Sequence, residues 1–344
     1  MSKEYLLTGG AGFIGSNYAK RLIARGAKII IFDNLSRPGT EKNLEWLYSQ
    51  YGPNAFHFIQ ADIRDSKAVN NAGRTADVIV HLAGQVAVTT SVNDPREDFE
   101  VNALGTFNVL EAARNSTKQP VVLYASTNKV YGGMEDLVVE EQVDSYRYRD
   151  FPLGISEARN LDFHSPYGCS KGCGDQYVHD YARIYKLPTV VLRQSCIYGP
   201  RQFGLEDQGW VAWFVIASIL GRPISIYGDG KQVRDLLYID DLLNAYDAAI
   251  DHISVSAGQV FNIGGGSENV MSVWAQFGPI LQRLLEHPIE VSYANWRPGD
   301  QKIYVSDISK AKRVFGWQPT ISVEKGIEKL FSWVKENQRL FQGD

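Results

Sequence analysis

The chain has 344 residues, of which 44% are hydrophobic and 22% are charged, and its formal net charge is −4. This composition is ordinary for a soluble globular protein, and the length suits one large domain or two coupled ones. The small negative charge argues against a nucleic-acid partner. No apolar run is long enough for a signal peptide or a membrane span, so we predict a cytoplasmic protein without a membrane partner.

Short apolar runs rich in β-branched residues alternate with helical segments along the first part of the chain. The predicted strands are 5–7, 28–32, 56–59, 78–80, 121–124 and 189–192. The predicted helices are 13–25, 96–115 and 167–185. Continuous apolar runs of this kind are typical of strands buried on both faces. The alternation predicts an α/β fold with a doubly wound parallel sheet, the Rossmann arrangement.

After about Tyr198 the pattern becomes mixed. Strands are predicted near Ile224 and Phe261, and helices near Trp210, Asp240, Trp274 and Glu324. We predict that residues 199–344 mainly form a smaller C-terminal α/β lobe that binds substrate, and that residues 1–198 form the dinucleotide-binding domain. The long polar and aromatic segment 132–165 is predicted to be a lid inserted into that domain rather than a disordered loop.

A glycine fingerprint, Thr8-Gly9-Gly10-Ala11-Gly12-Phe13-Ile14-Gly15, directly follows the first predicted strand and opens the first predicted helix. This is the context in which such a motif binds a dinucleotide. The glycines allow a tight turn and a close approach of the backbone to a pyrophosphate, whose charge the free amides of the helix can meet. We therefore predict cofactor contacts at Gly9, Gly12, Phe13, Ile14 and Gly15.

Further cofactor contacts are expected where later strands end. Asp33 ends the second strand, about 18 residues after Gly15, and a carboxylate there favours NAD over NADP, although Arg37 close by weakens that preference. Asp62 follows the third strand, where the adenine ring would lie, and a plain strand-end role is nearly as plausible for it as a cofactor contact. Asn102 is predicted to brace the backbone from inside a helix, and His81 to be a packed strand residue. The remaining predicted contacts are Asn34, Ser36, Ile63, Leu82, Ala83 and Gln85.

Tyr167 and Lys171 lie four residues apart on one predicted helix, downstream of the fingerprint. A phenol whose pKa is lowered by a nearby ammonium group can act as a base near neutral pH. We predict that Tyr167 takes the proton from a hydroxyl while a nicotinamide takes the hydride, and that Lys171 also holds the ribose. Ser126 or Thr127 would hydrogen-bond the reacting oxygen. A surface-pair role for Tyr167 and Lys171 is much less consistent with the fingerprint upstream.

These segments together resemble the extended short-chain dehydrogenase/reductase family over essentially the whole chain. Besides the motifs above, the matching pieces are Ser126-Thr127, Arg193 through Tyr198-Gly199-Pro200, Val233-Arg234-Asp235 and Arg297-Pro298-Gly299-Asp300. Within the family the chain is most similar to the CDP-tyvelose (CDP-paratose) 2-epimerase group, including the long insertion before Tyr167. The segments that carry this similarity are 32–37, 81–87, 126–132, 161–171 and 207–210.

The resemblance implies an activity, a cofactor and a partner. It implies tightly bound NAD and inversion at carbon 2 of a CDP-linked hexose, through transient oxidation to a keto sugar and return of the hydride to the opposite face. It also implies a homo-oligomer, a dimer or a tetramer, whose contact faces would be the helices near 96–115 and 167–185. The substrate contacts expected are Thr127, Asn128, Gln202, Arg234, Arg297 and Asp300.

Residues at two places in the sequence distinguish this chain from the 4,6-dehydratases and the 4-epimerases. The 4,6-dehydratases that this chain resembles carry an Asp-Glu pair after the threonine, where this chain has Asn128 and Lys129, so dehydration is disfavoured. Many 4-epimerases carry Asn where this chain has Cys196, and we expect Arg234 and Arg297 to bind phosphate instead. A UDP-sugar 4-epimerase is the main alternative, followed by a net dehydrogenase and an NAD-binding sensor.

The three cysteines, Cys169, Cys173 and Cys196, are an odd number and match no zinc-binding spacing. Cys169 and Cys173 are one helical turn apart, and no nearby residue completes a set of ligands. We therefore predict no metal site, and this use of cysteine fits a reducing compartment.

Overall fold

The computed structural model describes residues 2–297 and 300–342, so Pro298 and Gly299 of the predicted Arg297–Asp300 motif lie outside the described residues. Its centre is a seven-stranded sheet in the order β12-β8-β5-β4-β1-β2-β3, and all neighbouring strands are parallel. The strands are β1 Glu4–Thr8, β2 Lys28–Asp33, β3 His57–Gln60, β4 Val78–His81, β5 Val121–Thr127, β8 Thr189–Gln194 and β12 Gln259–Ile263. The doubly wound parallel sheet and its six predicted strands are confirmed.

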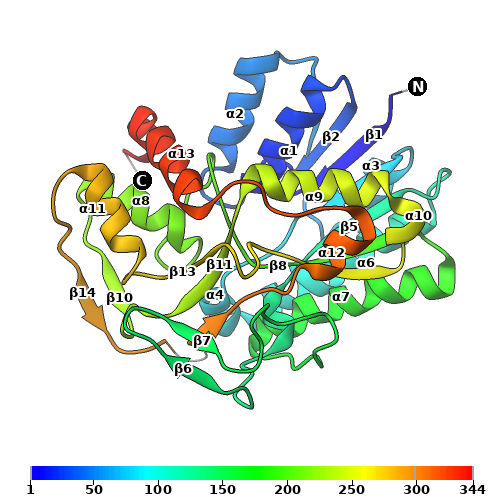
Figure 1. The fold of residues 1–344 in the computed structure, drawn as a ribbon. Helices are drawn as coiled ribbons and strands as arrows, with labels where there is room; N and C mark the ends of the chain where they lie inside the picture. The colour runs from blue at the N-terminus through cyan, green and yellow to red at the C-terminus, as the bar shows by residue number, and fades with distance from the viewer. Residues whose placement is uncertain (1, 298–299, 343–344) are drawn as a thin grey trace.

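Helices cover both faces of this sheet (Figure 1). One face packs against α1 Phe13–Ala24, α2 Thr40–Tyr51 and α9 Ile239–Asp251, and the other against α3 Ser66–Gly73, α6 Gly105–Arg114 and α7 Ser165–Tyr185. Neighbouring residues of β1 separate the two cores, because Leu7 belongs to the first and Leu6 to the second. This alternation is why the strands are apolar throughout.

The predicted helix 96–115 is not a single α-helix. It begins as α5 Pro95–Phe99, widens into the π-helical turn η1 Glu100–Leu104, and continues as α6. Turns of this type are rare and occur frequently at functional sites. Here the π-helical turn contains Asn102, one of the predicted cofactor-site residues.

The strand predicted near Phe261 does not belong to the smaller lobe. It is β12, the edge strand of the large sheet, and it pairs with β8. The helix predicted near Trp274 begins three residues later, as α11 Phe277–Leu285. Since the chain returns to the large sheet after residue 198, the division into two domains at that residue stays a prediction.

The second lobe contains two small sheets. One joins β9 Cys196–Tyr198, β11 Val233–Tyr238, β13 Val270–Ser272 and β15 Ile303–Tyr304, and the other joins β10 Ser225–Tyr227 and β14 Ser292–Ala294. The remaining helices are α4 Val88–Asn93, η2 Asn128–Tyr131, α8 Trp210–Leu220, α10 Ile253–Ser256, α12 Ser309–Phe315, α13 Val323–Glu336 and η3 Gln338–Phe341. In the described part of the chain, no helix combines the length and the apolar character that crossing a membrane requires.

The insertion 132–165 contains an antiparallel hairpin of β6 Val139–Glu141 and β7 Tyr146–Tyr148. Tyr146 and Tyr148 are buried in a cluster with Val233 of β11 and Ile303 of β15, and the Tyr148 hydroxyl donates to the Ile303 carbonyl oxygen at 2.9 Å. Figure 1 shows the hairpin against the second lobe, below β11 and β13. The segment is therefore folded onto the second lobe, and its role as a lid stays a prediction.

Candidate active site

The glycine fingerprint forms the turn between β1 and α1. Gly9 has a φ of +68°, and a Cβ added there would lie 2.7 Å from the Ala83 backbone nitrogen, so a larger residue would collide with the chain after β4. Gly12 is the N-cap of α1, no described side chain caps the helix, and its first turn holds no acidic residue. The free amides at this end are a suitable site for a phosphate. These features fit a dinucleotide.

The order of the strands explains the position of this turn. The chain winds outward from β1 in both directions, so β1 and β4 flank the point where the order reverses, and ligands bind beyond the carboxyl ends of strands there. The parallel register sets Thr8 level with Phe32 and His81. Gly9, Asp33 and Leu82, which follow those residues, therefore lie together at one edge of the sheet.

The carboxylate of Asp33 holds the loops of this edge together. It accepts hydrogen bonds from the backbone amides of Ala11 at 3.0 Å and Leu35 at 2.9 Å. Burial raises the pKa of Asp33, and the hydrogen bonds from Leu35, Ala11 and Gly12 oppose this. Each carboxylate oxygen has a second lone pair, so Asp33 retains acceptor capacity for a ribose diol.

The Asp62 side chain is engaged within the protein. The Arg64 side chain donates two hydrogen bonds to it, both at 2.8 Å, its backbone nitrogen donates a third at 2.9 Å, and Asn34 donates a fourth at 3.0 Å. The hydrogen bonds from Arg64 lower the pKa of Asp62 to about 2. This arrangement favours the plain strand-end role for the Asp62 side chain. Ile63 packs under Gly105 of α6, and the backbone nitrogen of Ser36 donates to the Asn34 side chain.

A buried polar network fixes the loop after β4. Asn102 accepts from the Gln85 amide at 2.9 Å and donates to the Gln85 carbonyl at 3.0 Å, which is the backbone bracing that we expected. Asn102 also contacts Asp98 at 3.1 Å and the Ser170 hydroxyl at 3.1 Å. Because Ser170 directly precedes Lys171, the network ties the loop to α7. Sequence reasoning missed Asp98 and Ser170, although polar residues in helix interiors were an available signal.

His81 is a buried strand residue, as predicted. Its ring contacts the hydroxyl groups of Thr8 at 2.7 Å and Thr106 at 3.0 Å. Burial and the charge of Lys171 lower the pKa of His81 to about 3, so the ring is neutral at physiological pH. It is held inside the sheet by these threonines and is not a candidate base.

Tyr167 and Lys171 lie near the N-terminus of α7, as predicted, but their electrostatic relation differs from the prediction. The Lys171 ammonium donates to the Ala125 carbonyl at 2.7 Å and lies 4.3 Å from the ring centroid of Tyr124. Burial raises the pKa of Tyr167, while a hydrogen bond from Thr127 and the charge of Arg37 lower it. Burial also lowers the pKa of Lys171, to about 7. The prediction that Lys171 lowers the pKa of Tyr167 is wrong for this structure, because burial dominates both groups.

The structure separates the two candidate hydroxyls on β5. Ser126 donates to the buried carboxylate of Asp175 at 2.7 Å, so its hydroxyl is engaged about two helical turns along α7 from Tyr167. Thr127 is the residue that hydrogen-bonds Tyr167. Of the two predicted hydroxyls, Thr127 is the one that acts on Tyr167, and the catalytic role of either residue stays a prediction.

The predicted substrate residues of the second lobe contact three different strands, β9, β10 and β11. Arg234 is buried and pairs with Asp300 at 2.7 Å. The Arg297 guanidinium stacks 3.9 Å from the ring centroid of Tyr227. Gln202 is buried, and its Oε1 has no hydrogen-bond partner among the described residues. A buried acceptor of this kind is costly unless a ligand or water satisfies it.

Two other predicted residues lie at the catalytic end of the site. The Asn128 side chain accepts from the Thr127 hydroxyl at 3.3 Å. Arg37 interacts electrostatically with Tyr167 and with Asp207. The positive charge of Arg37 lowers the pKa of Tyr167, and its expected effect on the preference for NAD stays a prediction.

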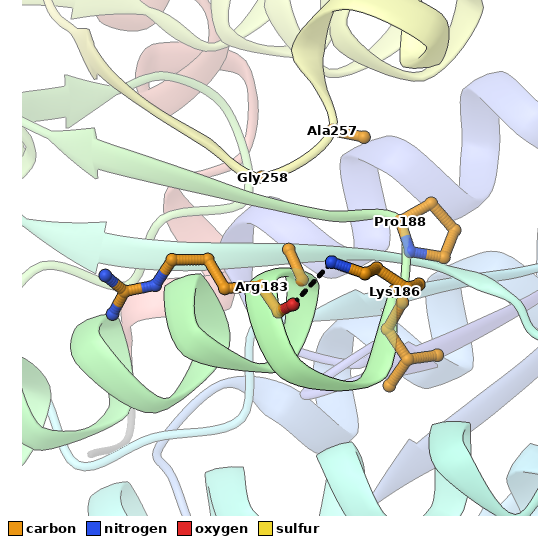
Figure 2. Close-up of a pocket in the computed structure, with 7 residues that line it drawn as sticks. Arg183, Lys186, Pro188, Ala257 and Gly258 are labelled. Carbon is orange, nitrogen blue, oxygen red and sulfur yellow. Dashed lines mark hydrogen bonds between the residues drawn. The ribbon is translucent and has the colours of Figure 1, made fainter.

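One surface cavity of about 260 Å³ lies far from these residues (Figure 2). It is lined by Arg183 and Lys186 at the end of α7, by Leu187 and Pro188 before β8, and by Ala257 and Gly258 before β12, with Ala182 completing the lining. These segments precede their strands, so the cavity is at the amino edge of the sheet. The predicted site residues are at the carboxyl edge.

Comparisons with known proteins agree with this geometry. Residues 6–330 match the protein family described as GDP-mannose 4,6 dehydratase. The chain is 43% identical over 341 residues to the CDP-paratose 2-epimerase of Salmonella typhi, with 96% of this chain and 98% of that protein covered. It is 32% identical over 335 residues to the UDP-glucose 4-epimerase of Mycolicibacterium smegmatis, with 97% and 99% covered.

Solved structures give the same result for the fold. A UDP-glucose 4-epimerase from Thermotoga maritima, crystallised with UDP-glucose, has a TM-score of 0.82 at 30% identity, covering 97% of this chain and 99% of that one. A dTDP-glucose 4,6-dehydratase from Streptomyces venezuelae, crystallised with NAD, has a TM-score of 0.83 at 28% identity, covering 98% of each chain. Both similarities extend over the large sheet and the second lobe.

Proposed function

Because the chain belongs to the extended short-chain dehydrogenase/reductase family, we propose that it is an NAD-dependent epimerase that inverts carbon 2 of a CDP-linked hexose. The family predicted from the motifs is thereby confirmed. The observation that carries the proposal is the pairing of Thr127 with Tyr167 on the edge that holds the glycine turn. The 43% identity to a CDP-paratose 2-epimerase supports the choice of carbon and nucleotide.

The residues of the site suit this reaction in defined roles. NAD, when bound, accepts a hydride from the sugar carbon and returns it, so no external oxidant or reductant is consumed. Tyr167 takes the proton of the reacting hydroxyl and gives it back to the same oxygen. The hydrogen bond between Thr127 and Tyr167 lowers the pKa of the phenol and so favours the phenolate. Lys171, beside Gly84 and Ala125, supplies a donor for the ribose.

The residues after Thr127 argue against dehydration. Removal of water needs an acid that protonates the leaving hydroxyl and a base that takes a carbon-bound proton. The amide of Asn128 is neither an acid nor a base near neutral pH, and Lys129 carries an amine rather than a carboxylate. These two residues therefore do not replace an Asp-Glu pair. The resemblance to 4,6-dehydratases therefore extends to the fold and the oxidation step only.

The test is incubation of the purified protein with CDP-paratose, CDP-glucose and UDP-glucose in deuterated water, followed by proton NMR. We expect inversion at carbon 2 of a CDP-sugar without deuterium at that carbon, because the hydride returns internally. Inversion at carbon 4 of UDP-glucose would assign the protein to the alternative class of 4-epimerases, which the relatives with 32% identity make the main competitor. Accumulation of NADH with substrate would contradict both.

We also propose that the protein is a homodimer that buries the outer faces of α5, α6 and α7. Large apolar side chains are exposed along these helices, with Phe99 56%, Phe107 40%, Tyr177 48% and Ile184 63% exposed. The rings of Phe107 and Tyr177 meet edge to face, with centroids 6.0 Å apart, so residues of two helices form one surface. Contiguous exposed apolar surface of this kind marks protein interaction sites.

Replacement of Phe107 and Ile184 by glutamate should convert the dimer into a monomer, because each charge would be buried in the interface. Size-exclusion chromatography with light scattering measures the mass directly. The matched control is Val255→Glu on α10, an equally exposed valine outside these helices, which should leave the mass unchanged. A wild-type protein that is monomeric at micromolar concentration would contradict the proposal.

A further inference from the structure

Lys129 extends from the end of β5 to the second lobe. It lies in η2, two residues after Thr127, and a Cβ added to Gly168 would be 3.4 Å from the Lys129 carbonyl oxygen. The backbone of Lys129 is therefore packed beside Tyr167. Its ammonium group reaches Gln301, whose Oε1 accepts at 3.2 Å, and Gln301 in turn donates to the Gly132 carbonyl.

Within the described part of the chain, the Lys129 ammonium forms no ion pair. The residue is half-buried, and its ammonium group donates to the neutral amide of Gln301. The charged groups that act on it are Arg234 and Asp300, and the carboxylate of Asp300 is already paired with Arg234 at 2.7 Å. The cluster thus holds two cations and one carboxylate.

A desolvated cation without a partner is unfavourable, and proteins compensate such groups with an opposite charge. Burial and the repulsion by Arg234 lower the pKa of Lys129 to about 8. A bound anion would relieve both effects. The surroundings of Lys129 are therefore those of an anion site that no residue of the described chain fills.

The position of this cluster matches the chemistry of carbon 2. In a nucleotide-linked hexose, carbon 2 is bonded to the anomeric carbon that carries the diphosphate, whereas carbon 4 lies across the ring from it. An enzyme that presents carbon 2 to its catalytic tyrosine must hold the β-phosphate close to that tyrosine. A cation two residues after the catalytic threonine is in the right place to meet it.

We infer that Lys129, together with Arg234, binds the β-phosphate of the sugar nucleotide and thereby favours reaction at carbon 2 over carbon 4. The inference rests on the proposed function for its choice of carbon. The phosphate contact itself rests on the unpaired cation and its packing beside Tyr167. Lys129 is then a specificity residue that touches the substrate and takes no part in the proton transfer.

The test compares CDP with CMP, which differ by the β-phosphate alone. Binding of both to the NAD-loaded protein is measured by calorimetry for the wild type, Lys129→Gln and Lys129→Arg. We expect Lys129→Gln to reduce the preference for CDP over CMP by about ten-fold, because one charge-assisted contact is lost. Lys129→Arg should keep most of the preference, and the exposed Lys231→Gln, which removes the same charge from the second lobe, should keep all of it.

An unchanged ratio of CDP to CMP affinity in Lys129→Gln overturns the inference, provided that the variant retains its NAD and its circular dichroism spectrum. Failure of the proposed function has a different signature, since the wild type would then invert no CDP-sugar and would prefer UDP to CDP. In that case the same variants measured with UDP and UMP still decide the phosphate contact. A smaller preference for UDP over UMP in Lys129→Gln supports the phosphate contact, and an unchanged preference contradicts it.

Discussion

Replacing Tyr167 with phenylalanine should lower kcat by about 10²–10⁴-fold, the usual contribution of a positioned general base. The phenol is the buried group at the carboxyl edge of the sheet that Thr127 hydrogen-bonds, so the variant loses the proton acceptor and keeps the ring that fills the site. NAD should remain bound, because the glycine turn and the N-terminus of α1 are untouched. The rate is measured by NMR as inversion of the CDP-sugar.

The control for this experiment is Tyr181→Phe on the same helix. Tyr181 is also buried and lies further along α7. Its hydroxyl donates to Glu111 of α6 at 2.8 Å. Each variant removes one phenolic hydroxyl from a buried side chain of α7, so a general loss of helix stability would affect both. Turnover of Tyr167→Phe within ten-fold of the wild type would exclude Tyr167 as the base.

The surroundings of Tyr167 differ from those that the sequence predicted. We expected from the four-residue spacing that Lys171 lowers its pKa, but spacing on a helix does not report burial. In the folded chain both groups lose contact with water, which raises the pKa of the phenol and lowers that of the ammonium. The groups that oppose this for Tyr167 are Thr127 and Arg37, which come from other segments. Such an environment exists only after the chain has folded.

The sheet was predictable because its pattern is local. Each of the first strands contains a short apolar run, and the fingerprint marks the first crossover. The strand β12 was assigned to the wrong sheet because its apolar run has the same length and composition whichever neighbour it pairs with. The choice between β8 and the second lobe is made by long-range packing.

The choice between Ser126 and Thr127 shows a similar limit within a single strand. The period of two places the residues on opposite faces of β5, which the sequence does reveal. Which of the two hydroxyls acts on Tyr167 depends on how α7 lies along β5, and Asp175, one helical turn after Lys171, fixes α7 there by accepting from Ser126. The Asp175 carboxylate accepts from both Ser126 of β5 and Arg193 of β8, so it fixes α7 to these two strands.

Removing the Asp175 carboxylate should destabilise the protein by about 3–5 kcal/mol, because it leaves a buried arginine without its counter-ion. Arg193 donates to both oxygens of Asp175 at 2.9 Å, and the two side chains are 4% and 0% exposed. Arg193 also donates to the Tyr131 hydroxyl at 3.1 Å, at the start of the insertion 132–165. The free energy of unfolding of Asp175→Ala, measured in urea, gives the cost.

Two further variants separate the charge from the packing. The double variant Asp175→Ala, Arg193→Met removes both charges, so it should be more stable than Asp175→Ala alone. The exposed pair of Asp180 and Arg183 on the same helix supplies the contrast, since Asp180→Ala should cost less than about 1 kcal/mol. A cost for Asp175→Ala as small as that for Asp180→Ala would mean that the buried pair does not hold α7 on β5.

The same network predicts that substitutions at Ser126 and Thr127 of β5 have different effects, one mainly on stability and the other mainly on turnover. Ser126→Ala removes one donor to Asp175 and leaves the Arg193 pair in place, so it should cost about 1–3 kcal/mol of stability and little turnover. Thr127→Val removes the hydroxyl that hydrogen-bonds Tyr167, so it should lower turnover more than stability. If Ser126→Ala instead lost turnover and Thr127→Val did not, Ser126 would be the residue at the reacting oxygen. The face of β5 that meets the substrate would then be the one that now binds Asp175.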